Sequence, residues 1–392
     1  MPGHAARLDY LPPYIFAVLG DRLREMETQG IDVVRLDVGS PDMPPAEHVI
    51  EALHRSACNP DNHGYSGYRG IPRFRQAVSR YYQRRFDVKI NADKEVLPLL
   101  GSKEGIINLC LAYLDRGDLV LIPDIGYPSY MQGARLAGAD IYWVQVSPEN
   151  GYLPDLSRIP DDVAQRAKML WVNYPNNPTG ATADLDFYKA ALEYCVKHDI
   201  LLASDNPYVD VTFDGYVAPS ALQVPDSIDY TVEFMSFSKS YNMAGWRLGA
   251  AVGSSKALNT LLRIKSNMDS GHFNAIFDAG IDALDNTPQS WLDERNMFYQ
   301  RRRDRLLAAL PEIGLTADKP AGSLYLWAKP TVISASTYVE QALNEAHVSL
   351  APGGAYGPGG EDFLRISVGI SDERLDESIN RLKAWYSSHH YA

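Results

Sequence analysis

Cysteines are scarce in this chain, and long apolar runs are missing. Cys58, Cys110 and Cys195 are three cysteines among 392 residues, and no two of them form a CxxC pair. An odd, widely spaced set argues against a disulfide framework or a metal site and is typical of a reducing cytoplasm. No stretch approaches the roughly 20 apolar residues that a membrane span needs. The N-terminal residues also lack the basic-then-apolar order of a signal peptide. We therefore expect a cytoplasmic protein without a membrane partner.

Basic residues are also fewer than acidic ones. The chain has 37 Lys and Arg against 49 Asp and Glu, a formal net charge of -12. A strongly acidic surface repels nucleic acid, so we expect no nucleic-acid partner. Any anionic ligand must instead be attracted by locally placed Arg, Lys and backbone N–H groups. The 45% of hydrophobic residues suffices for a large core without disulfides or metals.

The apolar pattern predicts an α/β fold. Five short apolar runs, nearly free of polar residues, indicate strands covered on both faces: residues 119–122, 169–172, 200–203, 232–235 and 248–252. Residues 103–114 and 184–198 between them have helical spacing, so we expect a mainly parallel central sheet flanked by helices.

The two ends of the chain predict a smaller α+β domain. Residues 1–45 are rich in proline and turn signals, and an amphipathic helix from about 290 precedes strand-like pieces at 324–328 and 363–368. We predict a large domain over 46–288 and a small domain formed by 1–45 plus 289–392.

The most informative string is SFSKSYNMAGWRLG at residues 236–249, which follows a predicted strand. Desolvation and the like charge of Arg247 favour the neutral form of Lys239, and a neutral amine is a nucleophile. Ser236, Ser238 and Arg247 offer donors for a phosphate. For a short SxSK string alone, a solvated loop lysine behind a capping serine is the ordinary alternative.

The full string resembles the lysine signature of class I/II aminotransferases, which are pyridoxal-phosphate (PLP) enzymes of fold type I. Every fixed position of that signature is filled: Ser236, Ser238, Lys239, Asn242, Gly245, Arg247 and Gly249. The resemblance extends over nearly the whole chain. It implies PLP held by Lys239 as a Schiff base, a fold type I large domain, and transfer of an amino group from an L-amino acid to a 2-oxo acid such as 2-oxoglutarate.

A second site is LGSKEG at residues 100–105, where a predicted helix begins. Helix N-termini present free N–H groups and attract anions. The resemblance assigns the cofactor phosphate to Ser102 and Lys103. An ordinary helix N-cap at Ser102 is compatible with the same residues.

Further motifs follow predicted strands, and the resemblance gives each a cofactor contact. Asn177 in NYPNNPTG would bind the ring hydroxyl. In SDNPY, Asp205 would keep the pyridine nitrogen protonated and Tyr208 would contact the ring hydroxyl; taken alone, such residues usually cap turns. Tyr127 would stack on the ring. Tyr65 would reach the phosphate of a neighbouring subunit, which implies a homodimer with shared active sites.

The resemblance also assigns the substrate. Arg365 in FLRIS matches the residue that binds the α-carboxylate, for which a planar guanidinium is suited. Gly39 would meet the same carboxylate through its backbone, with Asn177 beside it, and Tyr14 would close over it. Lys239, Asp205 and Tyr208 are the predicted catalytic residues.

The amino donor is less well defined. LPPYIF, VLPLLGSKEGI and IKSNMDSGHFNAI resemble bacterial LL-diaminopimelate aminotransferases. SDNPYVDV and APGGAYGPGGEDFLRIS depart from that subgroup, which leaves aspartate, alanine and aromatic donors open. A PLP-dependent lyase, which needs no oxo acid, is a further alternative. A regulator with an aminotransferase-like domain would need a DNA-binding segment, and none is recognisable.

Overall fold

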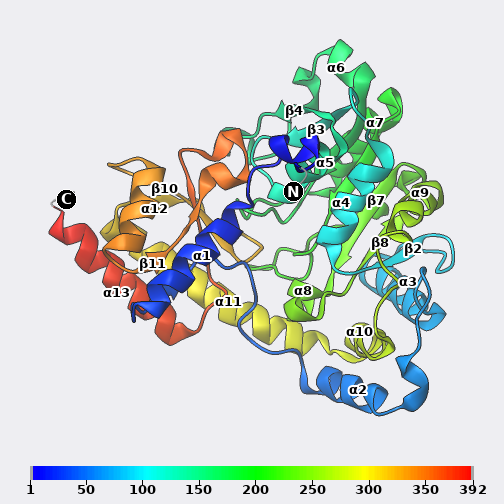
Figure 1. Cartoon of the computed structure of the whole chain (residues 1–392), viewed down its shortest axis with the longest axis horizontal. Helices are drawn as coiled ribbons and strands as arrows, with labels where there is room; N and C mark the ends of the chain where they lie inside the picture. The colour runs from blue at the N-terminus through cyan, green and yellow to red at the C-terminus, as the bar shows by residue number, and fades with distance from the viewer. Residues whose placement is uncertain (1–2, 390–392) are drawn as a thin grey trace.

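A sheet of seven strands runs through the larger lobe of the computed structural model, which describes residues 3–389 (Figure 1). In spatial order these are β2 (Val96–Leu99), β8 (Gly249–Gly253), β7 (Thr231–Ser236), β6 (Leu201–Asp205), β5 (Ala167–Val172), β3 (Leu119–Pro123) and β4 (Asp140–Val144). The strands from β7 to β4 pair in parallel, and β8 is antiparallel to both of its neighbours. The α/β prediction is confirmed, and each of the five apolar runs overlaps a strand of this sheet.

Helices cover both faces of this sheet. One face is covered by α4 (Ser102–Tyr113), α5 (Pro128–Ala137) and α9 (Ser255–Lys265). The other is covered by α3 (Pro72–Phe86), α10 (Asn274–Asn286), α7 (Leu185–His198) and the short α6 (Asp161–Arg166), and α2 (Glu47–Ala57) packs on α10. Successive strand residues point to opposite faces. In β7, for example, Phe234 is buried among the first group and Met235 among the second. Burial on both faces explains why these strands are nearly continuous apolar runs.

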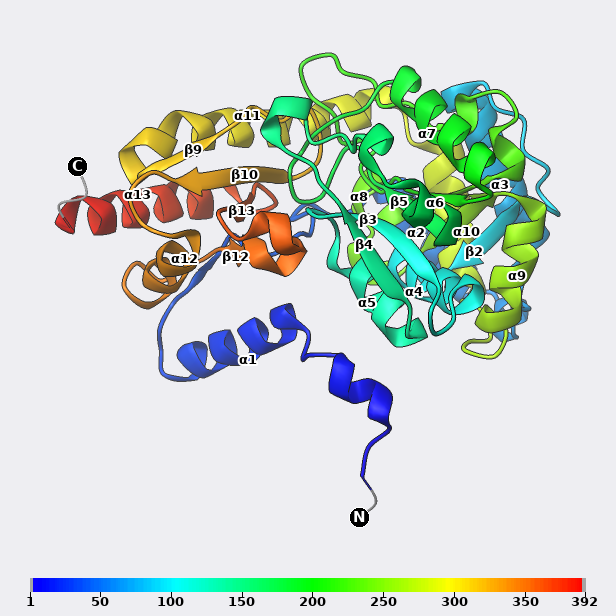
Figure 2. The ribbon, with the colours of Figure 1, turned by 90° about the horizontal axis from the view of Figure 1, so that it is seen from above.

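The smaller lobe contains an antiparallel sheet of four strands. Its order is β12 (Ala351–Pro352), β13 (Leu364–Ser367), β10 (Tyr325–Pro330) and β9 (Leu315–Ala317). The same lobe contains α12 (Ala335–Asn344) and α13 (Asp372–Ser388) (Figure 2). From the start of the chain, β1 (Val34–Arg35) pairs with β11 (Val348–Ser349), and α1 (Ile15–Thr28) packs beside α12 through Leu23 and Leu343. Both chain ends thus contribute to this lobe, while the boundaries at 45/46 and 288/289 stay a prediction.

The long helix α11 (Gln289–Ala309) runs between the two lobes (Figure 1). Near its start, Arg295 donates to the carbonyl oxygen of Lys239 at 3.0 Å. Two turns further on, Arg303 donates to the carbonyl oxygen of Pro320 at 2.7 Å. Both guanidinium groups are buried, so α11 is hydrogen-bonded to the backbone of each lobe. Across residues 3–389, no helix has the length and apolar character to cross a membrane.

Candidate active site

A cavity of about 350 Å³ lies at one edge of the large sheet. Parallel strands end at the same edge, and ligands of α/β sheets bind there. The turns after successive strands supply the lining: Ser102 after β2, Tyr127 after β3, Asn177 after β5, Asp205 at the end of β6 and Lys239 after β7. The order of strands in the sheet therefore brings together motifs that are up to 137 positions apart in the chain (102 to 239).

Every predicted site residue except Tyr65 lines this cavity. They are Tyr14, Gly39, Ser102, Lys103, Tyr127, Asn177, Asp205, Tyr208, Ser236, Ser238, Lys239, Arg247 and Arg365. Tyr65 lies outside it, with 91% of its surface exposed. The sequence reasoning did not name Phe16, Arg35, Asp37, Val38, Pro207, Tyr325 and Tyr356, which complete the lining. Three of these residues lie in strings that the sequence made recognisable: Phe16 in LPPYIF, Pro207 in SDNPY and Tyr356 in the glycine-rich segment that departs from the resembled subgroup.

Lys239 lies in the short helix α8 (Phe237–Ser240), directly after β7. Its Nζ donates a hydrogen bond to the carbonyl oxygen of Gly39. Burial, together with the nearby charges of Arg365 and Arg247, lowers the pKa of Lys239 to about 7. A large fraction of this amine is therefore neutral, and nucleophilic, near pH 7.

Asp205 is the last residue of β6 and is buried. Tyr130 on α5 donates to its Oδ2 at 2.7 Å, while Oδ1 is buried without a partner among the described residues. Burial raises the pKa of Asp205 to about 7, and the hydrogen bond from Tyr130 opposes that rise. A buried acceptor without a partner is rare in folded proteins. Oδ1 is thus a free acceptor for a ligand atom that carries a proton.

The N-terminus of α4 forms an anion-binding corner of the cavity. Gly101, not Ser102, occupies the N-cap position, with φ of 82° and ψ of 156°, which only glycine adopts readily. A Cβ at Gly101 would collide with the guanidinium of Arg247. A Cβ at Gly249 on β8 would lie 3.1 Å from the backbone nitrogen of Ser102. These two glycines therefore let the helix start and the Arg247 side chain approach each other closely.

Cationic and hydroxyl groups complete this corner. Ser236 and Ser238 line it from the end of β7, and the Ser236 hydroxyl accepts a hydrogen bond from the Ser238 backbone at 3.3 Å. Lys103 lies with its Nζ 4.1 Å from the centre of the Tyr14 ring, and burial lowers the pKa of Lys103. Backbone N–H groups, hydroxyls and a guanidinium are the donors that a phosphate needs.

Arg365 on β13 closes the cavity from the smaller lobe. Its guanidinium donates to Asn177 Oδ1 at 2.9 Å and to the carbonyl oxygen of Asp37 at 2.6 Å. It also lies 4.0 Å from the centre of the Tyr325 ring. Its Nε is buried without a partner among residues 3–389. The guanidinium is held in one plane with a donor free, which suits a carboxylate.

Tyrosines form the wall between the two lobes. The hydroxyls of Tyr208 and Tyr325 are 2.7 Å apart, so one donates to the other. Tyr356 lies 5.1 Å from the Arg365 guanidinium, measured to its ring centre. Burial raises the pKa of Tyr208 and of Tyr356 well above the ordinary value, so both phenols are neutral at pH 7.

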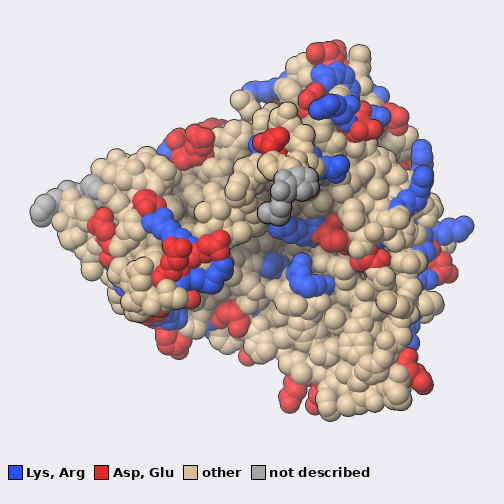
Figure 3. All heavy atoms as spheres, viewed as in Figure 1, with Lys and Arg blue, Asp and Glu red and all other residues tan. Residues whose placement is uncertain are grey.

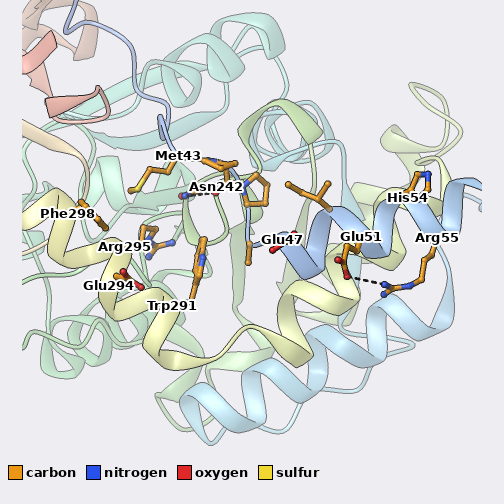
Figure 4. Close-up of a pocket in the computed structure, with 14 residues that line it drawn as sticks. Met43, Glu47, Glu51, His54, Arg55, Asn242, Trp291, Glu294, Arg295 and Phe298 are labelled. Atoms are coloured by element: carbon orange, nitrogen blue, oxygen red, sulfur yellow. Dashed lines mark hydrogen bonds and ion pairs between the residues drawn. The ribbon is translucent and has the colours of Figure 1, made fainter. Parts of the chain in front are cut away.

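A second cavity, of about 930 Å³, is lined by Asn242 and by residues of α2 and α11 (Figure 4). One wall is formed by Trp291, Glu294, Arg295 and Phe298 of α11, and the other by Met43 and the start of α2. A dashed line in Figure 4 marks the pair of Glu51 and Arg55 at its far end, 3.6 Å apart. This larger cavity has a mainly apolar lining and contains neither the buried lysine nor the buried carboxylate. The smaller cavity is therefore the candidate active site.

Basic side chains gather near the cavity although the chain as a whole is acidic. Figure 3 shows Lys and Arg side chains in the hollow between the two lobes, near the middle of the view. The chain as a whole carries a formal charge of -12. Local cations, and not the net charge, therefore provide the attraction for an anionic ligand.

Comparisons with known proteins show the family of this chain. The family described as "Aminotransferase class I and II" matches residues 31–382. An LL-diaminopimelate aminotransferase of Moorella thermoacetica is 45% identical, over 97% of this chain and 97% of its own length. The structure of apo-BacF from Bacillus subtilis superimposes with a TM-score of 0.94 at 34% identity, covering 98% of each chain. A mutant aspartate aminotransferase of Thermus thermophilus gives a TM-score of 0.91 at 29% identity, covering 98% of this chain and 100% of its own.

Proposed function

Because the chain belongs to the class I and II aminotransferases and is a PLP-dependent transaminase, we propose that it takes its amino group from LL-diaminopimelate and passes it to 2-oxoglutarate. One observation carries the chemistry. A buried lysine with a pKa of about 7 and a buried carboxylate with a free oxygen line the same cavity. When bound, PLP supplies a protonated ring that accepts electrons from the substrate carbon.

The residues of the cavity fit that cofactor. The N-terminus of α4, Ser236, Ser238 and Arg247 would bind its phosphate. Oδ1 of Asp205, the acceptor without a partner, would take the hydrogen bond of the ring N–H. Asn177 and Tyr208 would bind the ring hydroxyl, and Tyr127 would stack on the ring.

The substrate would be held and converted by side chains from both lobes. Arg365 would bind the α-carboxylate, with Gly39 contributing backbone contacts and Tyr14 covering the cavity. Lys239 would hold the cofactor covalently through its Nζ until the substrate amine takes its place. The freed amine of Lys239, neutral because its pKa is about 7, takes a proton from the substrate Cα. Asp205 in its ionised form would keep the ring nitrogen of the bound cofactor protonated.

The choice of donor rests on relatives. The Moorella protein at 45% identity is named for LL-diaminopimelate, whereas the Thermus structure at 29% identity is named for aspartate. Both donors are amino acids with a second carboxylate. We therefore rank LL-diaminopimelate first, with L-aspartate as the second candidate.

The attachment of the cofactor is tested with Lys239→Ala. The purified protein should lose the visible absorbance of the Schiff base and its transaminase activity. Lys329→Ala, at an exposed ion pair with Asp362, is the matched control and should retain both. Full absorbance in the Lys239 variant would contradict the assignment.

The donor is tested with a panel of LL-diaminopimelate, L-aspartate, L-alanine and L-phenylalanine, each with 2-oxoglutarate. We expect the highest kcat/KM for LL-diaminopimelate. No glutamate formed from that donor, with glutamate formed from another, would replace the proposed substrate. Release of ammonia without any oxo acid would instead indicate a lyase.

We also propose a homodimer with shared active sites, located in the cytoplasm. Ile50, Tyr65, Tyr68, Met268 and Phe273 are exposed large apolar side chains. Exposed apolar residues of this size favour a protein interface when they cluster. Figure 3 shows few charged side chains on the face over α2 and α10, at the lower right. All three cysteines are free thiols, which is compatible with a reducing compartment.

Mixing two inactive variants tests the shared site. Lys239→Ala lacks the nucleophile, and Tyr65→Ala lacks the tyrosine that would cross to the partner. A mixed dimer contains one site with both residues intact, so unfolding and refolding the two together should restore activity. Sedimentation should show a dimer. A monomer at micromolar concentration, or a mixture with no gain over the separate variants, would contradict the proposal.

A further inference from the structure

The two carboxylate oxygens of Asp205 have different surroundings. Oδ2 accepts a hydrogen bond from the Tyr130 hydroxyl at 2.7 Å, whereas Oδ1 is buried without a partner in the described part of the chain. The backbone oxygen of the same residue accepts from the side chain of Asn173 at 2.6 Å. Protein groups therefore hold the backbone oxygen and Oδ2 of Asp205, while Oδ1 remains available to a ligand in the cavity.

The Tyr130 hydroxyl has little freedom to point elsewhere. Its ring is 1% exposed and stacks on the indole of Trp171, with 4.7 Å between ring centres and 10° between planes. The edge of Tyr127 packs against it, with 5.8 Å between centres. The residue lies on α5, which packs on the sheet against β3 and β4. A rigid ring on a packed helix gives the hydroxyl one direction, toward Oδ2.

We propose that Tyr130 is a positioning residue of the transaminase: its hydroxyl holds Asp205 ionised and turns Oδ1 toward the ring nitrogen of the cofactor. This inference rests on the proposed function, because it assigns the ring nitrogen to the Asp205 side of the cavity. No atoms are exchanged with Tyr130. The only transfer involved is that of one proton between the ring nitrogen and Oδ1 of Asp205.

The physical effect has a definite sign. A phenol that donates to a carboxylate stabilises the ionised form. Without Tyr130, burial would act on Asp205 alone and would raise its pKa further. Tyr127 is the other phenol that faces Asp205, and both phenols are neutral at pH 7 because burial raises the pKa of each. Loss of the Tyr130 hydroxyl therefore moves the shared proton from the ring nitrogen toward Asp205.

The test uses Tyr130→Phe protein loaded with PLP labelled with ¹⁵N in the ring. A hydrogen bond to a charged group is worth enough to shift a titration by about one pH unit. We expect the ring nitrogen to lose its proton about one pH unit lower than in the wild type, and kcat to fall about tenfold. Tyr338→Phe is the matched control, since its buried hydroxyl donates at 2.7 Å to a backbone oxygen in the smaller lobe. It should leave the ¹⁵N shift unchanged.

A double-mutant cycle separates positioning from packing. In an Asp205→Asn background, Tyr130→Phe should add no further loss of kcat, because the carboxylate that it supports is gone. Additive losses, or an unchanged ¹⁵N titration in Tyr130→Phe, would overturn the inference. If Tyr130→Phe does not fold, Trp171→Phe replaces it. That variant keeps the hydroxyl but loosens the stacked ring, and a smaller shift in the same direction is expected; no shift overturns the inference.

The wild-type spectrum separates the two hypotheses. If the wild-type protein does not bind PLP, the proposed function fails. If it binds PLP with a protonated ring nitrogen and Tyr130→Phe titrates identically, only the role of Tyr130 fails.

Discussion

Arg365 makes three contacts that fix the orientation of its planar guanidinium. It donates to Asn177 and to the backbone of Asp37, and it lies on the Tyr325 ring. Its positive charge also lowers the pKa of Lys239. The residue therefore contributes a planar hydrogen-bonding surface and a charge. A substitution that keeps only the charge separates the two contributions.

Arg365→Lys keeps the charge and loses the planar pair of donors. A hydrogen bond to a charged group is worth about 2 kcal/mol. We expect kcat/KM to fall about thirtyfold, mostly through KM, while the Schiff-base absorbance keeps its pH dependence. Steady-state kinetics and a pH titration of the absorbance measure both. Arg22→Lys, at an exposed pair with Glu340, should change neither. An unchanged KM in Arg365→Lys would exclude the carboxylate role.

At the scale of single residues, the sequence motifs predicted side chains that line one cavity, among them Lys239, Asp205 and the start of α4. They did not predict the side chains that support them. Tyr130 acts on Asp205 across 75 positions, and Arg295 binds the backbone of Lys239 across 56. Such pairs depend on how helices pack on the sheet. Local spacing carries no signal for them, and Tyr130 in particular reads as one apolar residue of an amphipathic helix.

Among the structural elements, the N-terminus of α4 depends most on a single residue. Gly101 has a positive φ and leaves space for Arg247. Gly117 also has a positive φ, of 90°, but nothing lies within 4 Å of the position a Cβ would take. An added side chain would strain the backbone at both glycines. Only at Gly101 would it also meet another side chain, that of Arg247.

Gly101→Ala and Gly117→Ala are therefore a matched pair. A side chain at positive φ costs about 1 kcal/mol or more, so both variants should show a lower free energy of unfolding in urea. Only Gly101→Ala displaces the Arg247 guanidinium, so only it should weaken PLP binding, by about tenfold. Equal PLP affinities in the two variants would remove Arg247 and the helix start from the phosphate site.

The five strands expected from apolar runs are present in the sheet. Each is buried on both faces, so its own residues are nearly all apolar and the strand can be recognised from its local sequence. The sheet order is not local. Nothing in the run at 248–252 distinguishes an antiparallel strand from a parallel one, and β8 obtains its direction from its pairing with β7 and β2. Similarly, β1 pairs with β11 across more than 300 positions. The prediction of a smaller domain from both chain ends came from their proline, turn and strand-like patterns, which do not specify this pairing.

For the molecule as a whole, a buried acid and a buried base have pKa values that both lie near 7. Burial moves the pKa of Asp205 up from 3.8 to about 7 and the pKa of Lys239 down from 10.5 to about 7. In the proposed site, binding of PLP would need Lys239 neutral and Asp205 ionised. Both conditions are met as the pH rises above 7 and are lost together as it falls.

We therefore expect the protein stripped of PLP to bind the cofactor more slowly at pH 6 than at pH 8, by at least tenfold. Stopped-flow measurement of the Schiff-base absorbance gives the rate at each pH. In Asp205→Asn one of the two titrations is removed, so the dependence should become shallower. A flat profile in the wild type would contradict the shifted pKa of Lys239.

Asp205 and Lys239 also affect the stability of the folded protein. Between pH 4 and 7 the folded chain binds more protons than the unfolded one because of Asp205, so stability falls as pH rises. Between pH 7 and 10.5 the unfolded chain binds more because of Lys239, so stability rises again. The contribution of the pair is therefore lowest near neutrality. A ligand that binds only the folded chain offsets this loss, so a cell short of the vitamin precursor of PLP would lose the enzyme to proteolysis as well as its activity.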